Sequence, residues 1–326
     1  MAPNCRALLR ACVVSALLVA PTARSHPGDA GAAPLPTVQQ QQCVAAGWQR
    51  EVVDIGGRPR VVLWKAPEVW TGGAIVVLHG GGGAASNFCA ANVALIAPQV
   101  RFTRLALARG FAVFLPDSTD RVTDPRGRLC GKVWDDAAAG RDSLDLPFLE
   151  HLVSGLIPAQ RPAGSRHAVF LTGLSSGGYM SVRAASRLGS RIAGFAPVSS
   201  GDPYGWERDC TPLPGDRPNV RGMAFDVDGG QPIGAPGACD DRGDAGERSW
   251  DDGSGRPRFR LFHDLDDGIH DASCVARVRR QLLARGYPET PPFTLGTGTA
   301  RRALAHFWQD AYNQPLLDFF AGLPSP

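Results

Sequence analysis

The chain has 326 residues, of which 44% are hydrophobic and 20% are charged, a profile that fits a globular protein and excludes disorder, collagen and coiled coil. This length allows one large domain or two smaller ones. The formal charge is +3, but residues 1–25 hold Arg6, Arg10 and Arg24 and no acid. The rest of the chain is therefore neutral, and nothing in its charge favours nucleic acid as a partner.

Residues 1–25 have the pattern of a secretory signal peptide. Arg6 and Arg10 precede an apolar run over 11–20, and small residues over 21–25 supply a cleavage site. The run is too short to span a bilayer, which takes roughly 20 apolar residues, and no other stretch reaches that length. A secreted or periplasmic location is expected, and an ordinary N-terminal helix of a cytosolic protein is the alternative. Residues 26–48 are expected to form an N-terminal extension before one domain over 49–326.

Cysteine usage also favours export. After the signal segment the chain has an even number of cysteines, whose spacing matches no zinc or redox CxxC pattern: Cys43, Cys89, Cys130, Cys210, Cys239 and Cys274. Disulfides are expected. The favoured pairs are Cys89 with Cys130 and Cys210 with Cys239, because each pair brackets one loop-rich stretch. Isolated buried thiols are the alternative.

From residue 49 onward, alternating periodicities predict parallel strands covered by helices. Strands are expected over 61–64, 74–78, 111–115, 168–171, 192–198 and 258–263. Helices are expected over 101–109, 144–157, 176–188, 273–285 and 307–320, the last one interrupted by Pro315. Residues 199–256 are rich in Gly, Pro and Asp and predict a loop-rich insertion before the penultimate strand, without a complete calcium-ligand set. The expected fold is α/β, with a mostly parallel doubly wound sheet.

A serine at a strand-to-helix junction is the central chemical signal. The segment 173–177, GLSSG, fits G-x-S-x-G directly after a predicted strand and directly before a predicted helix. Such a turn holds the serine in a strained backbone conformation, and its neighbours approach too closely for side chains at the glycines. Ser175 is therefore the candidate nucleophile.

A glycine loop strengthens this signal, because the strand over 74–78 runs directly into His79 and four glycines. Such a loop can direct the backbone N–H groups of Gly81 and Gly82 at a developing oxyanion, with the N–H of Ser176 as the second donor at the helix start. A flexible turn and a phosphate-binding loop are the alternatives. A phosphate loop would need Lys followed by Ser or Thr after the glycines, where this chain has AAS.

A serine nucleophile needs a histidine base and a carboxylate that orients it, in the chain order Ser, Asp, His for this arrangement. His306 is the candidate base, since it follows the last strand region and opens the closing helix. The acid is expected after the strand over 258–263. Asp267 is the first choice there, Asp266 the second, and Asp202, after the preceding strand, a distant third.

With these residues in place, the chain resembles the α/β-hydrolases, and among them the secreted polyhydroxybutyrate depolymerases and feruloyl esterases. The likeness rests on IVVLHGGGG, FAVFLPD, LDLPFLEHLV, VFLTGLSSGGYMSVRAA, FAPVSSG and the Asp267 and His306 positions, across most of residues 74–320. The turn before Asp267 departs from the family pattern, because Asp264 stands where glycine is usual. The resemblance implies ester hydrolysis through an acyl-enzyme without a cofactor, with Ser175 attacking, His306 acting as base and then acid, and Asp267 orienting it.

The substrate is less well defined than the reaction. Trp134, Trp206 and Trp250 are candidates for the wall of an acyl or aryl pocket, with core packing as the alternative. No surface-binding domain follows the closing helix, so soluble or oligomeric esters are expected rather than solid polyester: hydroxyalkanoate oligomers, short acyl esters or hydroxycinnamoyl esters. Two alternatives stay open, an amidase acting on a polymer such as poly-aspartate and an inactive α/β-hydrolase that serves as a binding module. The oligomeric state is not indicated.

Overall fold

The computed structural model describes residues 33–90, 93–119, 132–136, 143–204, 250–251, 253–270, 272–298 and 303–324. The predicted signal segment, Cys130, Trp206, Cys210 and Cys239 lie outside these residues. Within the described ranges no helix is both long and apolar enough to cross a membrane.

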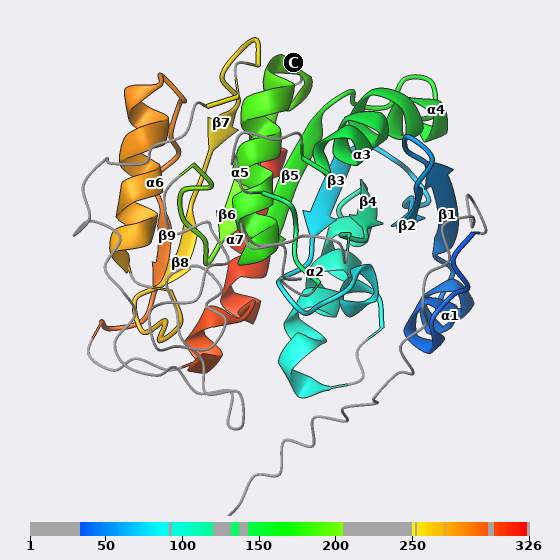
Figure 1. Cartoon of the computed structure of the whole chain (residues 1–326), viewed down its shortest axis with the longest axis horizontal. Helices are drawn as coiled ribbons and strands as arrows, with labels where there is room; N and C mark the ends of the chain where they lie inside the picture. Colours follow the sequence, from blue (N-terminus) through cyan, green and yellow to red (C-terminus); the bar gives the residue numbers. More distant parts are fainter. Residues whose placement is uncertain are drawn as a thin grey trace, which may run out of the picture.

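One sheet forms the centre of the molecule (Figure 1). In the described residues its strands are β1 (Gln49–Asp54), β2 (Pro59–Lys65), β3 (Gly73–Leu78), β4 (Phe111–Pro116), β5 (Val169–Leu174), β6 (Gly194–Val198), β7 (Arg258–Phe259), β8 (Phe262–Asp264) and β9 (Phe293–Leu295). Their order is β1-β2-β4-β3-β5-β6-β8-β9, and β7 pairs with β6. β2 pairs antiparallel with both β1 and β4, and the pairs from β4 to β9 are parallel. The mostly parallel sheet predicted from the sequence is confirmed.

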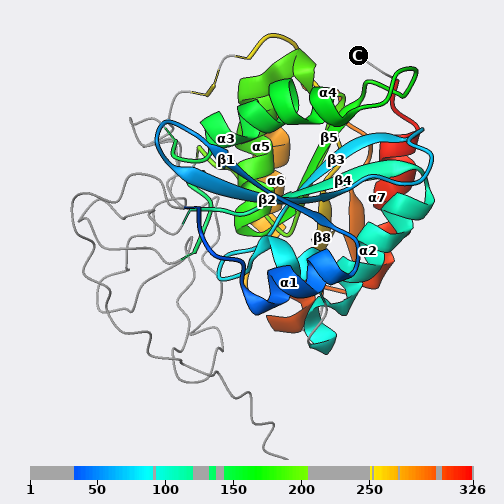
Figure 2. The same cartoon turned by 90° about the vertical axis from the view of Figure 1, so that its right-hand side faces the viewer.

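Helices cover both faces of this sheet (Figure 2). The described helices are α1 (Val38–Ala45), α2 (Ala97–Ala108), α3 (Leu146–His151), α4 (Ile157–Gln160), α5 (Ser176–Leu188), α6 (Ala272–Ala284) and α7 (Asp310–Ala321). Short turns are η1 (Ala85–Phe88), η2 (Ala94–Ile96), the π-turn η3 (Leu152–Leu156), η4 (Gly189–Arg191) and η6 (Ala303–His306). α1, α2 and α7 lie on one face, and α3 to α6 lie on the other.

The buried strand β3 divides the core between these two layers. All six of its residues are buried. Ala74, Val76 and Leu78 pack with the α3 to α6 layer, whereas Ile75 and Val77 pack with the α2 and α7 layer. Side chains alternate across a strand, so a strand covered on both faces becomes apolar throughout.

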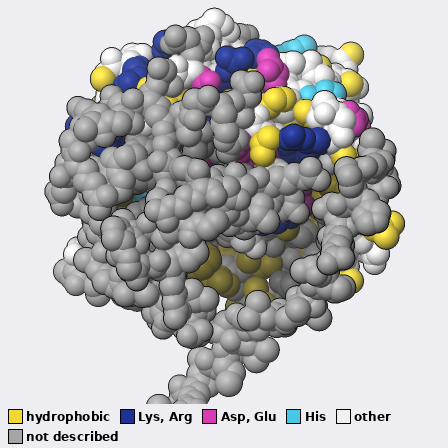
Figure 3. Space-filling view, viewed as in Figure 1, with side chains coloured by type: hydrophobic (Ala, Val, Ile, Leu, Met, Phe, Trp, Pro, Cys, Tyr) yellow, Lys and Arg dark blue, Asp and Glu magenta, His cyan; other side chains and the backbone are white. Residues whose placement is uncertain are grey.

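On the face seen in Figure 3, the described side chains near the top of the view mix basic and acidic groups.

Besides shifted ends of other elements, such as α2, which begins at Ala97 instead of 101, three predicted elements differ from the structure in their continuity. The helix over 144–157 continues past Pro158 as α4, after a π-turn in which the amide of Ile157 bonds to Leu152 five residues earlier. The closing helix begins at Asp310 and runs through Pro315 without interruption, because burial of its apolar face offsets the cost of an interior proline, about 3 kcal/mol. The strand over 258–263 divides into β7 and β8, with Arg260 and Leu261 between them.

The N-terminal segment packs on the domain through a disulfide. Cys43 in α1 is bonded to Cys89, with their Cα atoms 5.4 Å apart, so the predicted Cys89–Cys130 pair is wrong. The docking of α1 beside η1 brings Cys43 within the usual bridging range. Cys274 is also disulfide-bonded. The Cys210–Cys239 prediction falls outside the described residues.

Candidate active site

The turn between β5 and α5 holds Ser175 in a left-handed backbone conformation, with φ of 51°. Its amide donates to the Val198 carbonyl at 2.9 Å, which ties the turn to the end of β6. A Cβ at Gly173 would lie 2.5 Å from the Gly177 carbonyl oxygen, and one at Gly177 would lie 2.3 Å from the Leu78 carbonyl oxygen. The two motif glycines are therefore required by close backbone approach, as the sequence predicted.

The glycine loop lies beside this turn, because β3 and β5 are parallel neighbours and Leu78 is paired with Gly173. A Cβ added at Gly81 would lie 3.8 Å from the Cβ of Ser176. The amide of Gly82, in contrast, donates to the Lys132 carbonyl at 2.7 Å. Gly82 was expected to act as an oxyanion donor, and this hydrogen bond contradicts that expectation. The amides of Gly81 and Ser176 are left as the candidate donors.

Asp267 and His306 form a buried pair. Nδ1 of His306 lies 2.8 Å from Oδ2 of Asp267. The other carboxylate oxygen, Oδ1, accepts hydrogen bonds from the amides of Ile269 and His270, each at 2.8 Å. These contacts place the proton of the neutral imidazole on Nδ1 and leave Nε2 as its basic nitrogen. The pair thus has the geometry that orients a histidine base.

Its contact with His306 distinguishes Asp267 from the other two candidate acids, Asp266 and Asp202. Asp266 accepts a hydrogen bond from the amide of Thr297 at 3.4 Å, and Asp202 forms an ion pair with Arg277 at 3.4 Å. Burial alone would raise the pKa of Asp267, but the adjacent His306 and the nearby His270 lower it below its ordinary value. The ionised carboxylate is thus the form that the fold favours.

Backbone hydrogen bonds align the strand ends that carry these groups. Besides the Ser175 to Val198 bond, the amide of Ser199 donates to the Phe262 carbonyl at 2.9 Å. Only β6 stands between β5, which leads to Ser175, and β8, which leads to Asp267. His306 ends η6, which follows β9 on the far side of β8. The three residues therefore come from neighbouring carboxyl ends of the sheet, the usual place for a site in an α/β fold.

His270 is a neighbour of the site that the sequence did not identify. Its ring nitrogen Nε2 lies 3.0 Å from the Tyr179 hydroxyl, and its ring centroid lies 6.4 Å from that of His306. His270 follows Asp267 by only three residues, a spacing too short for the base in the expected order of nucleophile, acid and base. That same short spacing was the available signal for a residue packed against the pair.

The tryptophans proposed as pocket walls have other contacts in the structure. Trp134 is 1% exposed, and its indole N–H donates to the His79 carbonyl at 2.8 Å. The Trp250 ring stacks on the Tyr204 ring with centroids 4.1 Å apart, and its centroid lies 4.2 Å from the Arg285 guanidinium carbon. Both rings fit the packing interpretation better than the pocket interpretation. Trp206 lies outside the described residues. Among the described residues no group of three or more His, Cys, Asp or Glu could hold a metal ion.

No protein-family model and no curated protein matches the sequence. Solved structures match its fold. A puromycin-hydrolyzing peptidase of Mycobacterium tuberculosis aligns with a TM-score of 0.50 and 12% identity over 84% of this chain and 39% of that one. The Pyrococcus horikoshii acylaminoacyl peptidase aligns at 0.49 and 11% over 85% and 41%, and Est1E from Butyrivibrio proteoclasticus at 0.48 and 11% over 83% and 96%.

The chain spans about two fifths of the length of these two peptidases: the alignments cover 39% of the Mycobacterium tuberculosis protein and 41% of the Pyrococcus horikoshii protein. At such identities the likeness concerns the fold alone. The order of the parallel strands and the strained serine turn between β5 and α5 agree with it. The chain has the α/β-hydrolase fold.

Proposed function

We propose that the protein is a serine hydrolase that cleaves carboxylic esters through an acyl-enzyme intermediate. The observation that carries this proposal is the buried Asp267–His306 pair, with a contact of 2.8 Å, in a fold that places Ser175 on a strained turn two strands away. A silent binding module would have no need to orient a histidine in this way.

In the proposed reaction, Oγ of Ser175 attacks the ester carbonyl carbon while Nε2 of His306 takes the hydroxyl proton. Asp267 stabilises the resulting imidazolium through Nδ1. The negative charge on the former carbonyl oxygen is held by the amides of Gly81 and Ser176. His306 then gives its proton to the leaving alcohol. A water molecule, activated by the same histidine, hydrolyses the acyl-enzyme and restores Ser175.

The substrate class is proposed from the sequence resemblance: hydroxyalkanoate oligomers, short acyl esters or hydroxycinnamoyl esters, in soluble or oligomeric form. A secreted or periplasmic location belongs to the same proposal. The Cys43–Cys89 disulfide and the bonded Cys274 support it, because disulfides persist mainly in oxidising compartments. Nucleic acid, a membrane and a cofactor have no part in this proposal.

The test is a substrate panel with oxidised protein and its Ser175→Ala variant. The panel contains p-nitrophenyl acyl esters, methyl ferulate, soluble 3-hydroxybutyrate oligomers, poly-aspartate and solid polyester. We expect turnover of the soluble esters and a loss on the order of 10⁶ in the variant, because the triad acts as a unit. Turnover of poly-aspartate alone would assign an amidase instead. Absence of turnover together with no labelling of Ser175 by a fluorophosphonate would refute the enzyme proposal.

A further inference from the structure

A short segment, Lys132–Asp136, contacts both parts of the proposed oxyanion hole. On the glycine-loop side, the Lys132 carbonyl accepts the Gly82 amide at 2.7 Å. A Cβ added at Gly81 would lie 3.3 Å from Cγ1 of Val133. The segment therefore lies directly behind the loop that carries one of the two candidate donors.

Trp134 connects this loop to the other donor. Its indole N–H donates to the His79 carbonyl at 2.8 Å, and its backbone N–H donates to Oγ of Ser176 at 3.0 Å. Its ring also packs against the His79 ring, with centroids 5.1 Å apart. One residue thus binds the start of the glycine loop after β3 and the first residue of α5.

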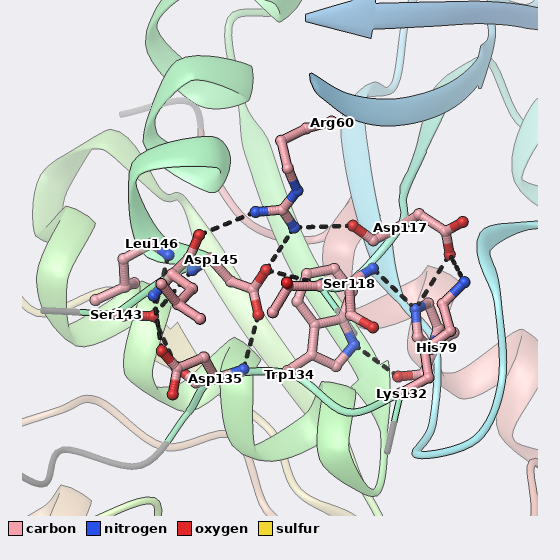
Figure 4. Close-up of polar contacts among 12 residues, drawn as sticks. Arg60, His79, Asp117, Ser118, Lys132, Trp134, Asp135, Ser143, Asp145 and Leu146 are labelled. Atoms are coloured by element: carbon pink, nitrogen blue, oxygen red, sulfur yellow. Dashed lines mark hydrogen bonds and ion pairs between the residues drawn. The ribbon is translucent and has the colours of Figure 1, made fainter. Parts of the chain in front are cut away.

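A buried charged network holds this segment in place (Figure 4). Asp145 is fully buried; its Oδ2 accepts the Asp135 amide at 2.7 Å, and its Oδ1 is paired with the Arg60 guanidinium. Asp135 in turn accepts the amide of Leu144 at 2.7 Å on its side chain and the hydroxyl of Ser143 at 2.7 Å on its carbonyl. Because an unpaired buried charge is costly, this network favours one position of the segment.

We propose that Trp134 is a positioning residue for the oxyanion hole, which sets the distance between the Gly81 and Ser176 amides through its two N–H groups. This inference rests on the proposed function. The donors come from different strands and must meet one oxygen at 2.7–3.1 Å. A misplacement of about 1 Å can cost about 100-fold in rate. Trp134 itself touches no substrate in this role.

The first experiment compares Trp134→Phe with Trp70→Phe. Both indoles are buried and donate to a backbone carbonyl, Trp70 to Gly73 at 2.7 Å. Trp70 lies just before β3, at the end of that strand opposite His79. We expect kcat of Trp134→Phe to fall about 10-fold to 100-fold with KM changed less than about twofold, because the loss concerns the transition state. Trp70→Phe is expected to lower the melting temperature comparably without this fall in kcat.

A second pair covers the case in which Trp134→Phe does not fold. Ser176→Ala removes the hydroxyl that accepts the Trp134 amide but keeps the Ser176 amide itself. Its control is Ser181→Ala in the same helix, which removes a buried hydroxyl bonded to Gly178 at 2.7 Å. We expect the fall in kcat for Ser176→Ala only. Equal kcat values for the two variants would overturn the inference.

Labelling by a fluorophosphonate separates this inference from the proposed function. In that reaction Oγ of Ser175 bonds to phosphorus, fluoride leaves, and the hydroxyl proton passes to His306. We expect slower labelling of Trp134→Phe than of Trp70→Phe. Equal labelling rates in the two variants, with normal labelling of the unmodified protein, would overturn the positioning role alone. No labelling of the unmodified protein would overturn the proposed function and this inference with it.

Discussion

Asp267→Asn is the substitution that tests the proposed triad most directly. Oδ1 of Asp267 accepts two backbone amides at 2.8 Å, and Oδ2 accepts Nδ1–H of His306 at 2.8 Å. An asparagine keeps only one oxygen, which the two amides retain. Its NH₂ group then faces Nδ1 of His306 and stabilises the tautomer that carries its proton on Nε2. That tautomer cannot accept the Ser175 proton, so kcat is expected to fall about 10⁴-fold.

The same substitution also has an expected effect on stability. Loss of one charge-assisted hydrogen bond is expected to cost about 2 kcal/mol at neutral pH. The pKa of Asp267 is lowered, because His306 and His270 outweigh the effect of burial. An acid with a lowered pKa contributes stability above its unfolded pKa, about 3.9, and loses it as the pH falls through the folded value. The stability difference between the two proteins should therefore shrink below about pH 4.

Steady-state ester hydrolysis and urea denaturation at pH 7 and pH 3.5 measure the two effects. Asp266→Asn is the comparison, because Asp266 binds the Thr297 amide rather than His306. Retention of more than about a tenth of kcat in Asp267→Asn would show that the orienting role is wrong. Loss of kcat in Asp266→Asn alone would move that role to Asp266.

Two further predictions concern the framework of the site. Replacing Cys43 and Cys89 by alanine removes a bridge between residues 46 positions apart. The chain-entropy relation gives an expected loss of about 4 kcal/mol in the free energy of unfolding, measured by urea titration. A loss below about 1 kcal/mol would contradict this expectation. Gly177→Ala places a Cβ 2.3 Å from the Leu78 carbonyl oxygen, whereas Gly155→Ala meets only the His151 ring at 3.6 Å. We expect Gly177→Ala to lower the free energy of unfolding by about 3 kcal/mol and to remove most of the activity, and Gly155→Ala to be tolerated. Melting temperature and kcat measure the two effects.

The sequence predicts best those elements that are buried on both sides. The bounds expected for α5, Ser176 to Leu188, match the structure. β3 and β4 are continuous apolar runs, β5 is interrupted only by Thr172 and Gly173, and the residues of all three strands are buried. β1 and β9 were missed because both are largely half-buried or exposed, so burial imposes no clear period on their sequence.

Hydrophobic patterns and local motifs could not predict contacts between residues distant in the sequence. A motif can indicate that Gly82 lies in an oxyanion loop, but the partner of its amide is the carbonyl of Lys132, and nothing local to either residue predicts that bond. The same applies to Cys43, whose approach to Cys89 depends on how α1 docks. Asp267 and His306, in contrast, were predictable from chain order, because the acid is expected after the strand over 258–263 and the base after it, before the closing helix.

Backbone strain at the ends of the neighbouring strands β5 and β6 bears on how Ser175 is positioned. Among the described residues other than glycine, only Ser175 and Ser199 have positive φ, 51° and 47°. Each follows a buried strand, and the amide of each donates to the next strand: Ser175 to Val198 at the end of β6, and Ser199 to Phe262 at the start of β8. Left-handed backbone of this kind costs about 1–3 kcal/mol per residue and persists only where surrounding bonds enforce it. The sheet supplies those bonds, so the rigidity of β5, β6 and β8 fixes the direction in which the Ser175 side chain is presented.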